Sequence, residues 1–255
     1  MLVAITRKIS PGMAKCELTH LARAPIDVGR AAEQHQAYEQ QLEALGCRVT
    51  SLPAEAELPD SVFVEDAAVV FDEVAILARP GAESRRAEVE SVAKALEPYR
   101  PLARIEAPGT LDGGDVLTAG KRVFVGLSRR TNQAGIEQMR VLLTPHGYSV
   151  ASVPVKRCLH LKSAVSQVAE NTLLINPAWI EAGAFQDFEL IEVDPAEPFA
   201  ANALLVNGAV IYPAAYERTG KRLAERGIGV ATVEVSELAK AEGGVTCCSL
   251  LLKTK

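Results

Sequence analysis

The sequence predicts an α/β fold in which five β-β-α-β units close into a ring around a central polar channel. Two short apolar strands joined by a tight turn precede each of three clear helical patterns, and each helix leads into a further apolar strand. Two consecutive helices begin near residues 84 and 131, about 47 residues apart, a spacing typical of repeat architectures. No Pro-, Gly- or Ser-rich linker interrupts this alternation, so we expect a single domain over residues 1–255.

The N-terminal segment contains a strand, a helix and a strand, predicted at residues 2–6, 27–46 and 47–52. Asp27 is placed to cap the start of the helix, and Gly46 lies just past its end. Tyr38, Leu42 and Leu45 recur along one face. This spacing indicates an amphipathic helix that packs on a sheet.

Three complete units follow. Their hairpins are predicted at residues 69–77, 116–126 and 203–212, their helices at 84–99, 131–147 and 216–227, and their last strands at 102–105, 149–153 and 229–233. Gly120 lies in the turn of the second hairpin, and the third has Asn207-Gly208, a dipeptide favoured in two-residue hairpin turns. Each unit therefore has the same order of elements.

Two further units are less regular. A hairpin at residues 164–175 leads to a strand at residues 188–193 through a segment without a good helical pattern, so we interpret it as a degenerate copy. A C-terminal strand at residues 248–253 has no unit of its own. Together with the N-terminal strand, helix and strand it supplies a fifth unit, provided that the two ends of the chain meet.

Composition and charge exclude several classes of protein. The chain of 255 residues is 48% hydrophobic and 23% charged, which is typical of a globular domain with a large core. It carries 27 basic and 32 acidic residues, a net charge of −5, without a Lys/Arg cluster, so we expect no nucleic-acid partner. No apolar run reaches about 18 residues, and the N-terminal apolar stretch is too short for a secretory signal. We therefore expect no membrane partner and a cytoplasmic location.

The cysteines indicate free thiols. They number five, an odd count, and none is spaced as in a C-x-x-C or Cys/His metal site. They lie at Cys16, Cys47, Cys158, Cys247 and Cys248. We expect reduced thiols and no metal site.

Chemically reactive residue types precede four of the predicted strands. The four motifs are FVED at residues 63–66, GTLDGGD at 109–115, LHLK at 159–162 and GGVTCC at 243–248. In a ring the polar ends of the inner strands converge near the axis, so these motifs can meet in space. Carboxylates, a histidine and a cysteine form a complete set for covalent catalysis on a cationic substrate.

Each of these residues also has a structural interpretation. The carboxylates of the two acidic motifs can hydrogen-bond the turns beside them, and adjacent glycines occur in plain turns. His160 lies between two leucines, where a hydrogen-bonded core histidine is common. Cys247 and Cys248 face opposite ways on an extended chain, so that one can be buried as a small apolar residue while the other lines a cavity.

Taken jointly, the motifs resemble the dimethylarginine dimethylaminohydrolases, a family of the guanidine-modifying pentein superfamily. The similar stretches keep the order and spacing of the family: AITR, LPDSVFVEDAAVV, RPGAESRRAEVE, GTLDGGDVL, FVGLSRRTNQAG, LHLKS, AANALLVN and GGVTCCSLLL. The resemblance implies a five-bladed α/β propeller, in agreement with the predicted ring. It also implies hydrolysis of asymmetric dimethylarginine or monomethylarginine to citrulline and dimethylamine or methylamine.

The resemblance implies specific catalytic roles. It makes Cys247 the nucleophile and His160 the general acid and base, with Asp112 as the carboxylate that orients the histidine. Cys248 resembles the non-catalytic neighbour of some family members. The implied intermediate is an S-alkylthiouronium on the cysteine, and neither step of the reaction needs a metal or an organic cofactor.

At the guanidinium end of the substrate, the resemblance implies an acidic pocket. Glu65 and Asp66 match residues that grip the guanidinium. Asp60 and Phe63 match pocket residues near the guanidinium and its alkyl chain.

At the amino-acid end, the resemblance implies two cations and a cover. Arg85 and Arg130 match the arginines that hold the substrate carboxylate, although each could instead form a local surface salt bridge of little energetic weight. Residues 8–23 correspond to a mobile lid, in which Leu18 is the expected covering residue.

Two other functions are weighed beside this one. A related pentein activity, such as a deiminase or an amidinotransferase acting on free or differently substituted arginine, would use the same covalent intermediate. A non-catalytic five-bladed binding protein would not need the cysteine, the histidine or the carboxylates. The expected partner is the small-molecule substrate, methylated arginine, and the resemblance leaves a homodimer open.

Overall fold

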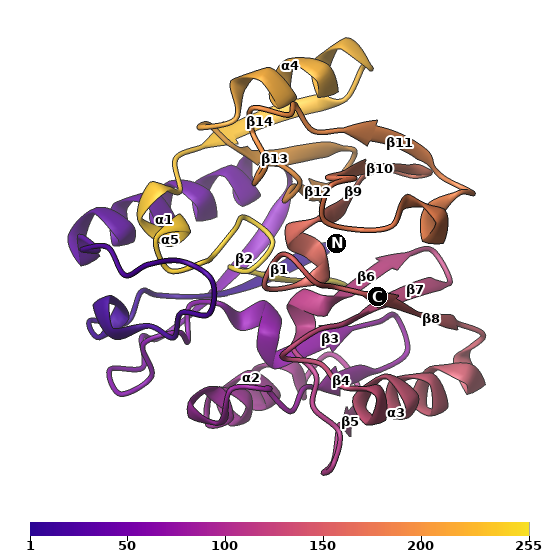
Figure 1. The fold of residues 1–255 in the computed structure, drawn as a ribbon. Coiled ribbons are helices and arrows are strands. Elements are labelled where there is room, and N and C mark those ends of the chain that lie inside the picture. The colour runs from indigo at the N-terminus through magenta and orange to yellow at the C-terminus, as the bar shows by residue number, and fades with distance from the viewer. Residues whose placement is uncertain (255) are drawn as a thin grey trace.

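The computed structural model describes residues 1–254, which form five three-stranded sheets arranged around one axis (Figure 1). In every sheet the first strand pairs antiparallel with the second, and the second pairs parallel with the third. A parallel neighbour requires a crossover connection, which the helices supply in four of the five sheets. The five-unit α/β propeller predicted from the sequence is confirmed.

The sheets are numbered as blades in chain order. Blade 1 contains β15 (Leu250–Lys253), β1 (Leu2–Arg7) and β2 (Cys47–Leu52), with helix α1 (Val28–Ala44). Blade 2 contains β3 (Ala68–Val70), β4 (Ala75–Leu77) and β5 (Leu102–Arg104), with α2 (Glu88–Leu96). Blade 3 contains β6 (Val116–Ala119), β7 (Arg122–Leu127) and β8 (Ser149–Pro154), with α3 (Gln133–Leu143).

The last two blades follow the same plan. Blade 4 contains β9 (Val165–Ala169), β10 (Thr172–Ile175) and β11 (Glu189–Glu192). Blade 5 contains β12 (Leu204–Val206), β13 (Ala209–Pro213) and β14 (Gly229–Val233), with α4 (Glu217–Glu225). In blade 4 a short 3₁₀ helix, Ala182–Phe185, stands in place of the crossover α-helix, so the degenerate copy is confirmed.

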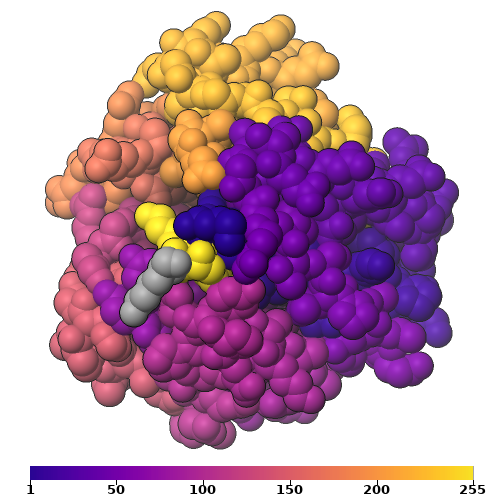
Figure 2. Space-filling view, turned by 180° about the vertical axis from the view of Figure 1, so that it is seen from behind, coloured from indigo at the N-terminus to yellow at the C-terminus, as the bar shows by residue number. Residues whose placement is uncertain are grey.

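The two ends of the chain close the ring in blade 1. Strand β1 pairs antiparallel with β15, with Leu2 opposite Lys253, and parallel with β2 on its other side. The Thr254 backbone N–H donates to the Met1 carbonyl oxygen at 2.9 Å. Figure 2 shows the N-terminal and C-terminal residues together at the centre of the rear face, surrounded by the other blades. The predicted fifth unit, built from both ends, is confirmed.

Local sequence signals explain the helix boundaries and the turns. The Asp27 carboxylate accepts a hydrogen bond from the Arg30 backbone N–H, and Gly46 has a φ of 86° just past α1. Asn207 and Gly208 have φ values of 47° and 87°, so both adopt the left-handed conformation that a two-residue hairpin of this kind requires.

Apolar side chains fill the five seams between neighbouring blades. Strand β1 shows the principle, because successive side chains point to opposite faces of a strand. Ala4 packs in the seam with blade 5, whereas Val3 and Ile5 pack in the seam with blade 2. Both faces of the middle strand of each sheet are thus buried, which is why β1, β4, β7, β10 and β13 have nearly continuous apolar runs instead of alternating ones.

The first strand of every blade faces the axis. Residues of β15, β3, β6, β9 and β12 line a shared cavity of ≈ 190 Å³, together with polar side chains at one end. We call this cavity the central channel, and it confirms the channel that the sequence predicts. Glu65, Lys162 and Thr246 belong to its lining.

Two local differences separate the structure from the prediction. The helix expected over residues 84–99 is divided into a 3₁₀ turn, Glu83–Arg85, and α2, because the Arg85 side chain is drawn inward to buried carboxylates. A short helix that was not predicted, α5 (Ser236–Ala239), is too brief to show a periodic pattern. All five cysteines are free thiols, as predicted. Within residues 1–254, no helix has the length and apolar character needed to cross a membrane.

Candidate active site

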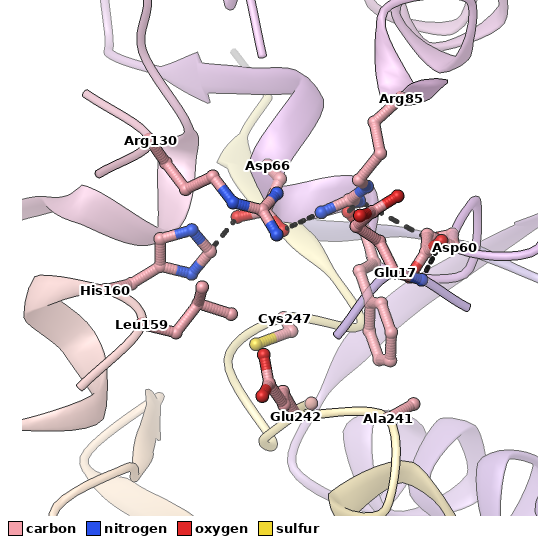
Figure 3. Close-up of a pocket in the computed structure, with 12 residues that line it drawn as sticks. Glu17, Asp60, Asp66, Arg85, Arg130, Leu159, His160, Ala241, Glu242 and Cys247 are labelled. Carbon is pink, nitrogen blue, oxygen red and sulfur yellow. Dashed lines mark hydrogen bonds and ion pairs between the residues drawn. The ribbon is translucent and has the colours of Figure 1, made fainter. Parts of the chain in front are cut away.

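A small cavity lies where the chain enters the first strands of the blades, next to the polar end of the central channel. It measures ≈ 20 Å³, about the space of one water molecule. Figure 3 shows the side chains that line it. Seven of the ten predicted site residues are among them: Asp60, Phe63, Asp66, Arg85, Arg130, His160 and Cys247. An amino acid of the size of arginine can enter only if the covering segment moves.

The adjacent cysteines have different surroundings. Cys247 lines the cavity, and its Sγ accepts the Gly244 backbone N–H at 3.3 Å. Cys248 is buried among apolar side chains in the seam between blades 1 and 5. Burial, together with the negative charges of Glu65 and Asp66, raises the pKa of Cys247 to about 12. In the free protein Cys247 is therefore a neutral thiol at physiological pH.

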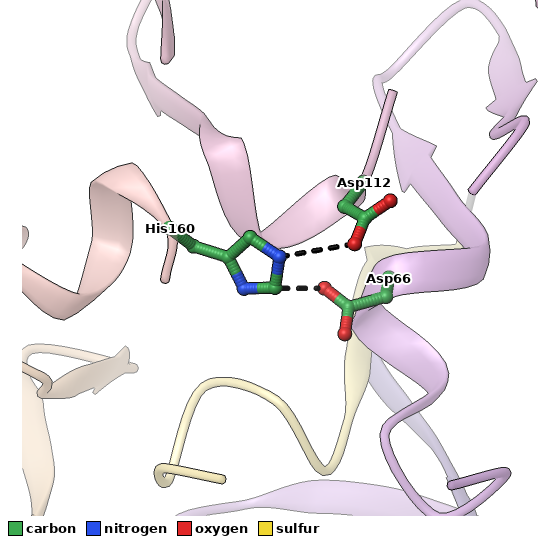
Figure 4. Close-up of side chains that lie close together, drawn as sticks. All are labelled: Asp66, Asp112 and His160. Atoms are coloured by element: carbon green, nitrogen blue, oxygen red, sulfur yellow. Dashed lines mark hydrogen bonds and ion pairs between the residues drawn. The ribbon is translucent and has the colours of Figure 1, made fainter. Parts of the chain in front are cut away.

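His160 lies between two carboxylates (Figure 4). Its Nε2 is 3.0 Å from Asp112 Oδ2, and its Nδ1 is 3.8 Å from Asp66 Oδ1. Burial alone would lower the pKa of His160, but the charges of Asp66, Asp112 and Asp115 outweigh it and raise the pKa to about 9. The imidazole is therefore protonated at neutral pH. Asp112 is fully buried behind the ring, in the position expected of an orienting carboxylate.

The glycine pair in the GTLDGGD motif provides the space for this cluster. A Cβ on Gly114 would lie 2.5 Å from His160 Nδ1 and 2.8 Å from Asp66 Oδ1, so a side chain would displace both groups. The Gly114 backbone N–H also donates to Asp66 Oδ1 at 3.0 Å. The close approach of backbone to side chain, and not an unusual φ, accounts for this glycine.

Asp66, Asp112 and His160 each place one potential metal-ligating atom within 4.8 Å of the others. Two guanidinium groups already neutralise the carboxylates. Arg85 Nη1 lies 2.6 Å from Asp66 Oδ2, and Arg130 Nη1 lies 3.6 Å from Asp112 Oδ2. A metal ion bound here would be repelled by the two guanidinium groups, so we interpret the cluster as an acid–base group.

Arg85 lines the cavity and pairs with buried carboxylates. It is buried, and its guanidinium donates to the carboxylates of Asp66 and Glu88 and to the carbonyl oxygens of Asp60 and Phe63. These contacts engage Nε, Nη1 and Nη2 of a side chain that also lines the cavity, and contact of Arg85 with a substrate carboxylate stays a prediction. Arg85 holds Asp66 in place: the positive charges of His160 and Arg85 overcome burial and keep the pKa of Asp66 well below its usual value.

Arg85→Met is expected to lower the free energy of unfolding by about 3–5 kcal/mol, because it leaves two buried carboxylates without their cation. Urea denaturation of the purified variant measures this loss. Adding Glu88→Gln to Arg85→Met removes one of the uncompensated charges and should recover part of the stability. A loss below about 1 kcal/mol would be that of an exposed salt bridge and would contradict this interpretation.

Arg130 has a guanidinium nitrogen, Nη1, that is ion-paired with Asp112 at 3.6 Å but makes no hydrogen bond within residues 1–254. Its Nη2 donates to Thr19 Oγ1 at 2.8 Å, and its Nη1 is buried. A buried N–H group without a partner is costly, and an incoming acceptor relieves that cost. Both predicted arginines line the cavity, but within residues 1–254 only Arg130 has a buried guanidinium nitrogen that makes no hydrogen bond.

Glu65, which is predicted to bind the guanidinium, is placed on the neighbouring cavity, and its binding role stays a prediction. It lies outside the small cavity and faces the central channel, where Oε1 is 2.5 Å from Lys162 Nζ and Oε2 accepts the Thr246 hydroxyl proton at 2.8 Å. Glu65 and Asp66 are neighbours in a 3₁₀ turn, Val64–Ala67, in which successive side chains point about 120° apart. In this structure Asp66 lines the small cavity and Glu65 lines the central channel.

Leu18, the expected covering residue, lies next to Glu17, and its covering role stays a prediction. It packs against the apolar seam of blades 5 and 1 and is not part of the cavity wall, to which Glu17 contributes instead. The segment is held by polar contacts: Asp60 Oδ2 accepts the Glu17 N–H at 3.0 Å, and Glu242 accepts the N–H groups of Thr19 and its two successors at 2.5–3.0 Å. These hydrogen bonds tie the segment to Asp60 on one side and to Glu242 on the other.

Several residues of the site carry no role in the sequence-based prediction. Glu88 lies three residues after Arg85, and this helical spacing for an ion pair was an available signal. Glu242 has a φ of 60° and precedes the glycine pair of the GGVTCC motif. Lys162 pairs with a residue 97 positions away, which local sequence patterns do not reveal.

Comparisons with known proteins agree with this geometry. A sequence profile of the family described as N,N dimethylarginine dimethylhydrolase, eukaryotic, matches residues 23–252. The chain is 41% identical over 234 residues to the N(G),N(G)-dimethylarginine dimethylaminohydrolase of Pseudomonas aeruginosa, with 91% of each protein covered.

Two solved structures are closely similar. The Pseudomonas aeruginosa enzyme, as a cysteine-to-serine mutant complexed with citrulline, has a TM-score of 0.94 and 39% identity, with 98% of both chains covered. A dimethylarginine dimethylaminohydrolase with a histidine-to-glycine substitution, as an adduct with S-methyl-L-thiocitrulline, has a TM-score of 0.94 and 38% identity over 99% of this chain and 100% of that one. With the profile match over most of the chain, these likenesses show that the chain belongs to the N,N-dimethylarginine dimethylhydrolase family.

Proposed function

We propose that the protein hydrolyses an Nω-methylated arginine, either asymmetric dimethylarginine or monomethylarginine, to citrulline and the corresponding methylamine. The observation that carries this proposal is the arrangement of Cys247 and His160 on one small cavity, with Asp66 buried beside the histidine. The citrulline complex and the thiocitrulline adduct of the two relatives support the same class of substrate.

Charge fixes the orientation of the substrate in the cavity. A guanidinium carbon is a poor electrophile because resonance spreads its positive charge, so it must be held close to the nucleophile. Asp66 and Asp60 supply negative charge for the guanidinium, and Arg130 supplies its Nη1 for the carboxylate at the other end of the amino acid. Phe63 adds an apolar wall for the alkyl chain.

The first step is attack by Cys247 on the guanidinium carbon. The positive charge of the bound substrate lowers the pKa of the thiol, and because His160 is already protonated, the thiol proton passes to solvent when substrate binds. The thiolate forms a C–S bond and a tetrahedral adduct. His160, protonated in the free protein, gives its proton to the departing nitrogen, and the C–N bond breaks to leave a planar S-alkylthiouronium.

The second step restores the enzyme. His160, now neutral, takes a proton from a water molecule, and the resulting hydroxide attacks the same carbon. The C–S bond then breaks, the hydroxyl proton of the adduct passes to the departing sulfur, and citrulline leaves with Cys247 again a neutral thiol. Asp112 holds Nε2 throughout, which keeps the ring in one orientation through both proton transfers.

The test is to measure citrulline and amine together after incubation with asymmetric dimethylarginine, monomethylarginine or arginine. Equal amounts of citrulline and amine, and higher kcat/KM for a methylated substrate, are expected. Preference for arginine would indicate a deiminase, and transfer of the amidino group to an added amine would indicate an amidinotransferase. Binding of a macromolecule without turnover of any guanidine would indicate a binding protein.

Arg130→Ala is expected to raise KM for dimethylarginine by about 10- to 100-fold, because a charge-assisted contact to the carboxylate is lost. The change in kcat should be smaller. Steady-state kinetics measures both parameters, with Arg104→Ala as a control because Arg104 forms an exposed ion pair with Glu90 away from the cavity. An unchanged KM for Arg130→Ala would contradict recognition of the carboxylate at this residue.

The wider setting of the enzyme is also part of the proposal. The five blades share their seams and their cavities, so we treat residues 1–255 as one catalytic domain that binds a small molecule. Five free thiols suit a reducing compartment, and the cytoplasm is the proposed location. A homodimer, and the lack of a nucleic-acid or membrane partner, stay predictions.

A further inference from the structure

Asp115 is a fully buried carboxylate for which the mechanism above has no use. It ends the 3₁₀ turn Gly113–Asp115 and has both oxygens engaged. Oδ1 accepts the Leu161 backbone N–H at 2.9 Å, and Oδ2 accepts the Ser128 hydroxyl proton at 2.6 Å. The two donors lie 33 positions apart in the chain and belong to the segments that carry His160 and Arg130.

The Ser128 contact holds the turn that carries Arg130. Ser128 Oγ accepts the backbone N–H groups of Arg130 at 3.0 Å and of Thr131 at 3.1 Å. Because both acceptor positions of the hydroxyl are used, its proton is directed to Asp115. The Asp115 carboxylate thereby orients the Ser128 hydroxyl, and this hydroxyl holds the backbone of Arg130. Arg130 is the cavity-lining residue whose Nη1 makes no hydrogen bond within residues 1–254.

The Leu161 contact holds the backbone next to His160. His160 is the extended residue before the 3₁₀ turn Leu161–Ser163, and the N–H donated to Asp115 begins that turn. The direction of the imidazole toward Asp112 depends on this backbone position. Asp112 itself is held by the turn that carries Arg130, since its backbone N–H donates to Thr131 Oγ1 at 3.1 Å.

The space around Asp115 is shaped for a carboxylate in this position. A Cβ on Gly126 would lie 2.6 Å from Asp115 Oδ1, so strand β7 carries a residue without a side chain where it passes the carboxylate. An ordinary turn-capping aspartate on the surface would need no such clearance.

We propose that Asp115 is a positioning residue that couples the two ends of the substrate site, joining the backbone of the acid–base histidine to that of the carboxylate-binding arginine through Ser128. The inference rests on the proposed function. The coupling has a consequence for substrate specificity. When the α-carboxylate of the substrate binds Arg130, the position of His160 is affected through Ser128 and Asp115, so the carboxylate increases kcat as well as affinity. A methylated guanidine without a carboxylate should be turned over slowly even when it saturates the enzyme.

The first experiment compares two substrates in two variants. Asymmetric dimethylarginine and its decarboxylated counterpart, dimethylagmatine, have the same guanidine group and differ in the carboxylate. Ser128→Ala should lower kcat for dimethylarginine by about tenfold and leave kcat for dimethylagmatine nearly unchanged. Ser166→Ala is the matched control, because Ser166 is a buried serine that also bridges two backbone groups, Ala201 and Ala203, but lines the central channel.

The control should lose stability and keep kcat for both substrates. Equal loss of kcat for both substrates in Ser128→Ala would show a purely structural role and overturn the inference. Ser128→Thr, which keeps the hydroxyl, should recover at least half of the lost kcat for dimethylarginine. Failure of this rescue in a folded variant would also overturn it.

A second experiment does not depend on turnover. The imidazole of His160 is followed by NMR with labelled histidine while citrulline is added to wild type, Ser128→Ala and Asp115→Asn. Citrulline should shift the His160 signal in wild type, and by less than half as much in both variants. Equal shifts in all three proteins, or failure of citrulline to bind, would overturn the coupling.

Asp115→Asn should also lower the pKa of His160 in the same titration. The charged groups that face the imidazole are Asp66 from the FVED turn, and Asp112 and Asp115 from the GTLDGGD turn. Arg85 and Arg130 pair with Asp66 and Asp112, whereas Asp115 has no Arg or Lys ion pair within residues 1–254 and its negative charge acts on His160. If wild type hydrolyses no methylated arginine but shows the citrulline-dependent shift, the proposed function fails and the coupling stands.

Discussion

Cys247→Ser is expected to reduce kcat for methylated arginine by about 10⁴-fold or more, whereas Cys248→Ser keeps most of the activity. A serine hydroxyl is a far weaker nucleophile than a thiolate, and the charge of the bound substrate cannot lower its pKa into the physiological range. Cys248 is buried in the apolar seam between blades 1 and 5, so its substitution affects packing and not the reacting atoms. Measurement of citrulline release under saturating substrate compares the variants.

The two serine variants are controls for each other, because they differ by one position and make the same chemical change. Mass spectrometry of acid-quenched enzyme adds a direct observation: a covalent adduct should accumulate on wild type and on Cys248→Ser but not on Cys247→Ser. Activity in Cys247→Ser together with inactivity in a folded Cys248→Ser would show that the second thiol is the nucleophile.

His160→Asn is expected to lower kcat by about 10³-fold, which is within the usual effect of removing a general acid and base. Asparagine keeps a polar group near Asp112 but cannot deliver a proton to the leaving amine or accept one from water. A substrate analogue with a leaving group that needs no protonation should regain part of the first step in this variant. Equal losses for both substrates would argue against His160 as the acid.

The same variant tests the protonation state of the histidine. The pKa of His160 in the folded protein is raised to about 9 from an ordinary value of 6.5, so its contribution to stability is fully present below pH 6.5. That contribution is lost as pH rises through 9. The difference in unfolding free energy between wild type and His160→Asn should therefore shrink by about 3 kcal/mol from pH 6 to pH 9.5. A difference independent of pH would mean that the folded protein holds a neutral imidazole.

Much of the fold follows from short-range patterns. Asp27 and Gly46 define the ends of α1, and Asn207-Gly208 defines the hairpin of blade 5, because the conformations that these positions require are accessible to few residue types. The ring itself was predictable from counting units, since a strand with two apolar faces must be covered on both sides. The helix α5 was missed because four residues contain barely one turn of periodicity.

The sequence patterns also revealed one part of the active site and missed another. The motifs identified Cys247, His160 and Asp66, and the structure brings all three to one cavity. They did not reveal the direction of each side chain. Glu65 differs from Asp66 by one position, yet it faces Lys162 in the central channel.

The sequence by itself determined the number of units, their order and the chemical groups available at the ends of the inner strands. Only the tertiary structure decided how similar neighbouring groups are placed: Asp66 and Cys247 line the small cavity, whereas Glu65 lines the central channel and Cys248 is buried in a seam. It also decided that Arg85 pairs with Asp66 and Glu88, while Arg130 has an Nη1 without a hydrogen bond within residues 1–254. The physical reason is that backbone propensities and apolar periodicity act between near neighbours in the chain. The partner of a buried charge is instead set by residues that come together only when the five blades close.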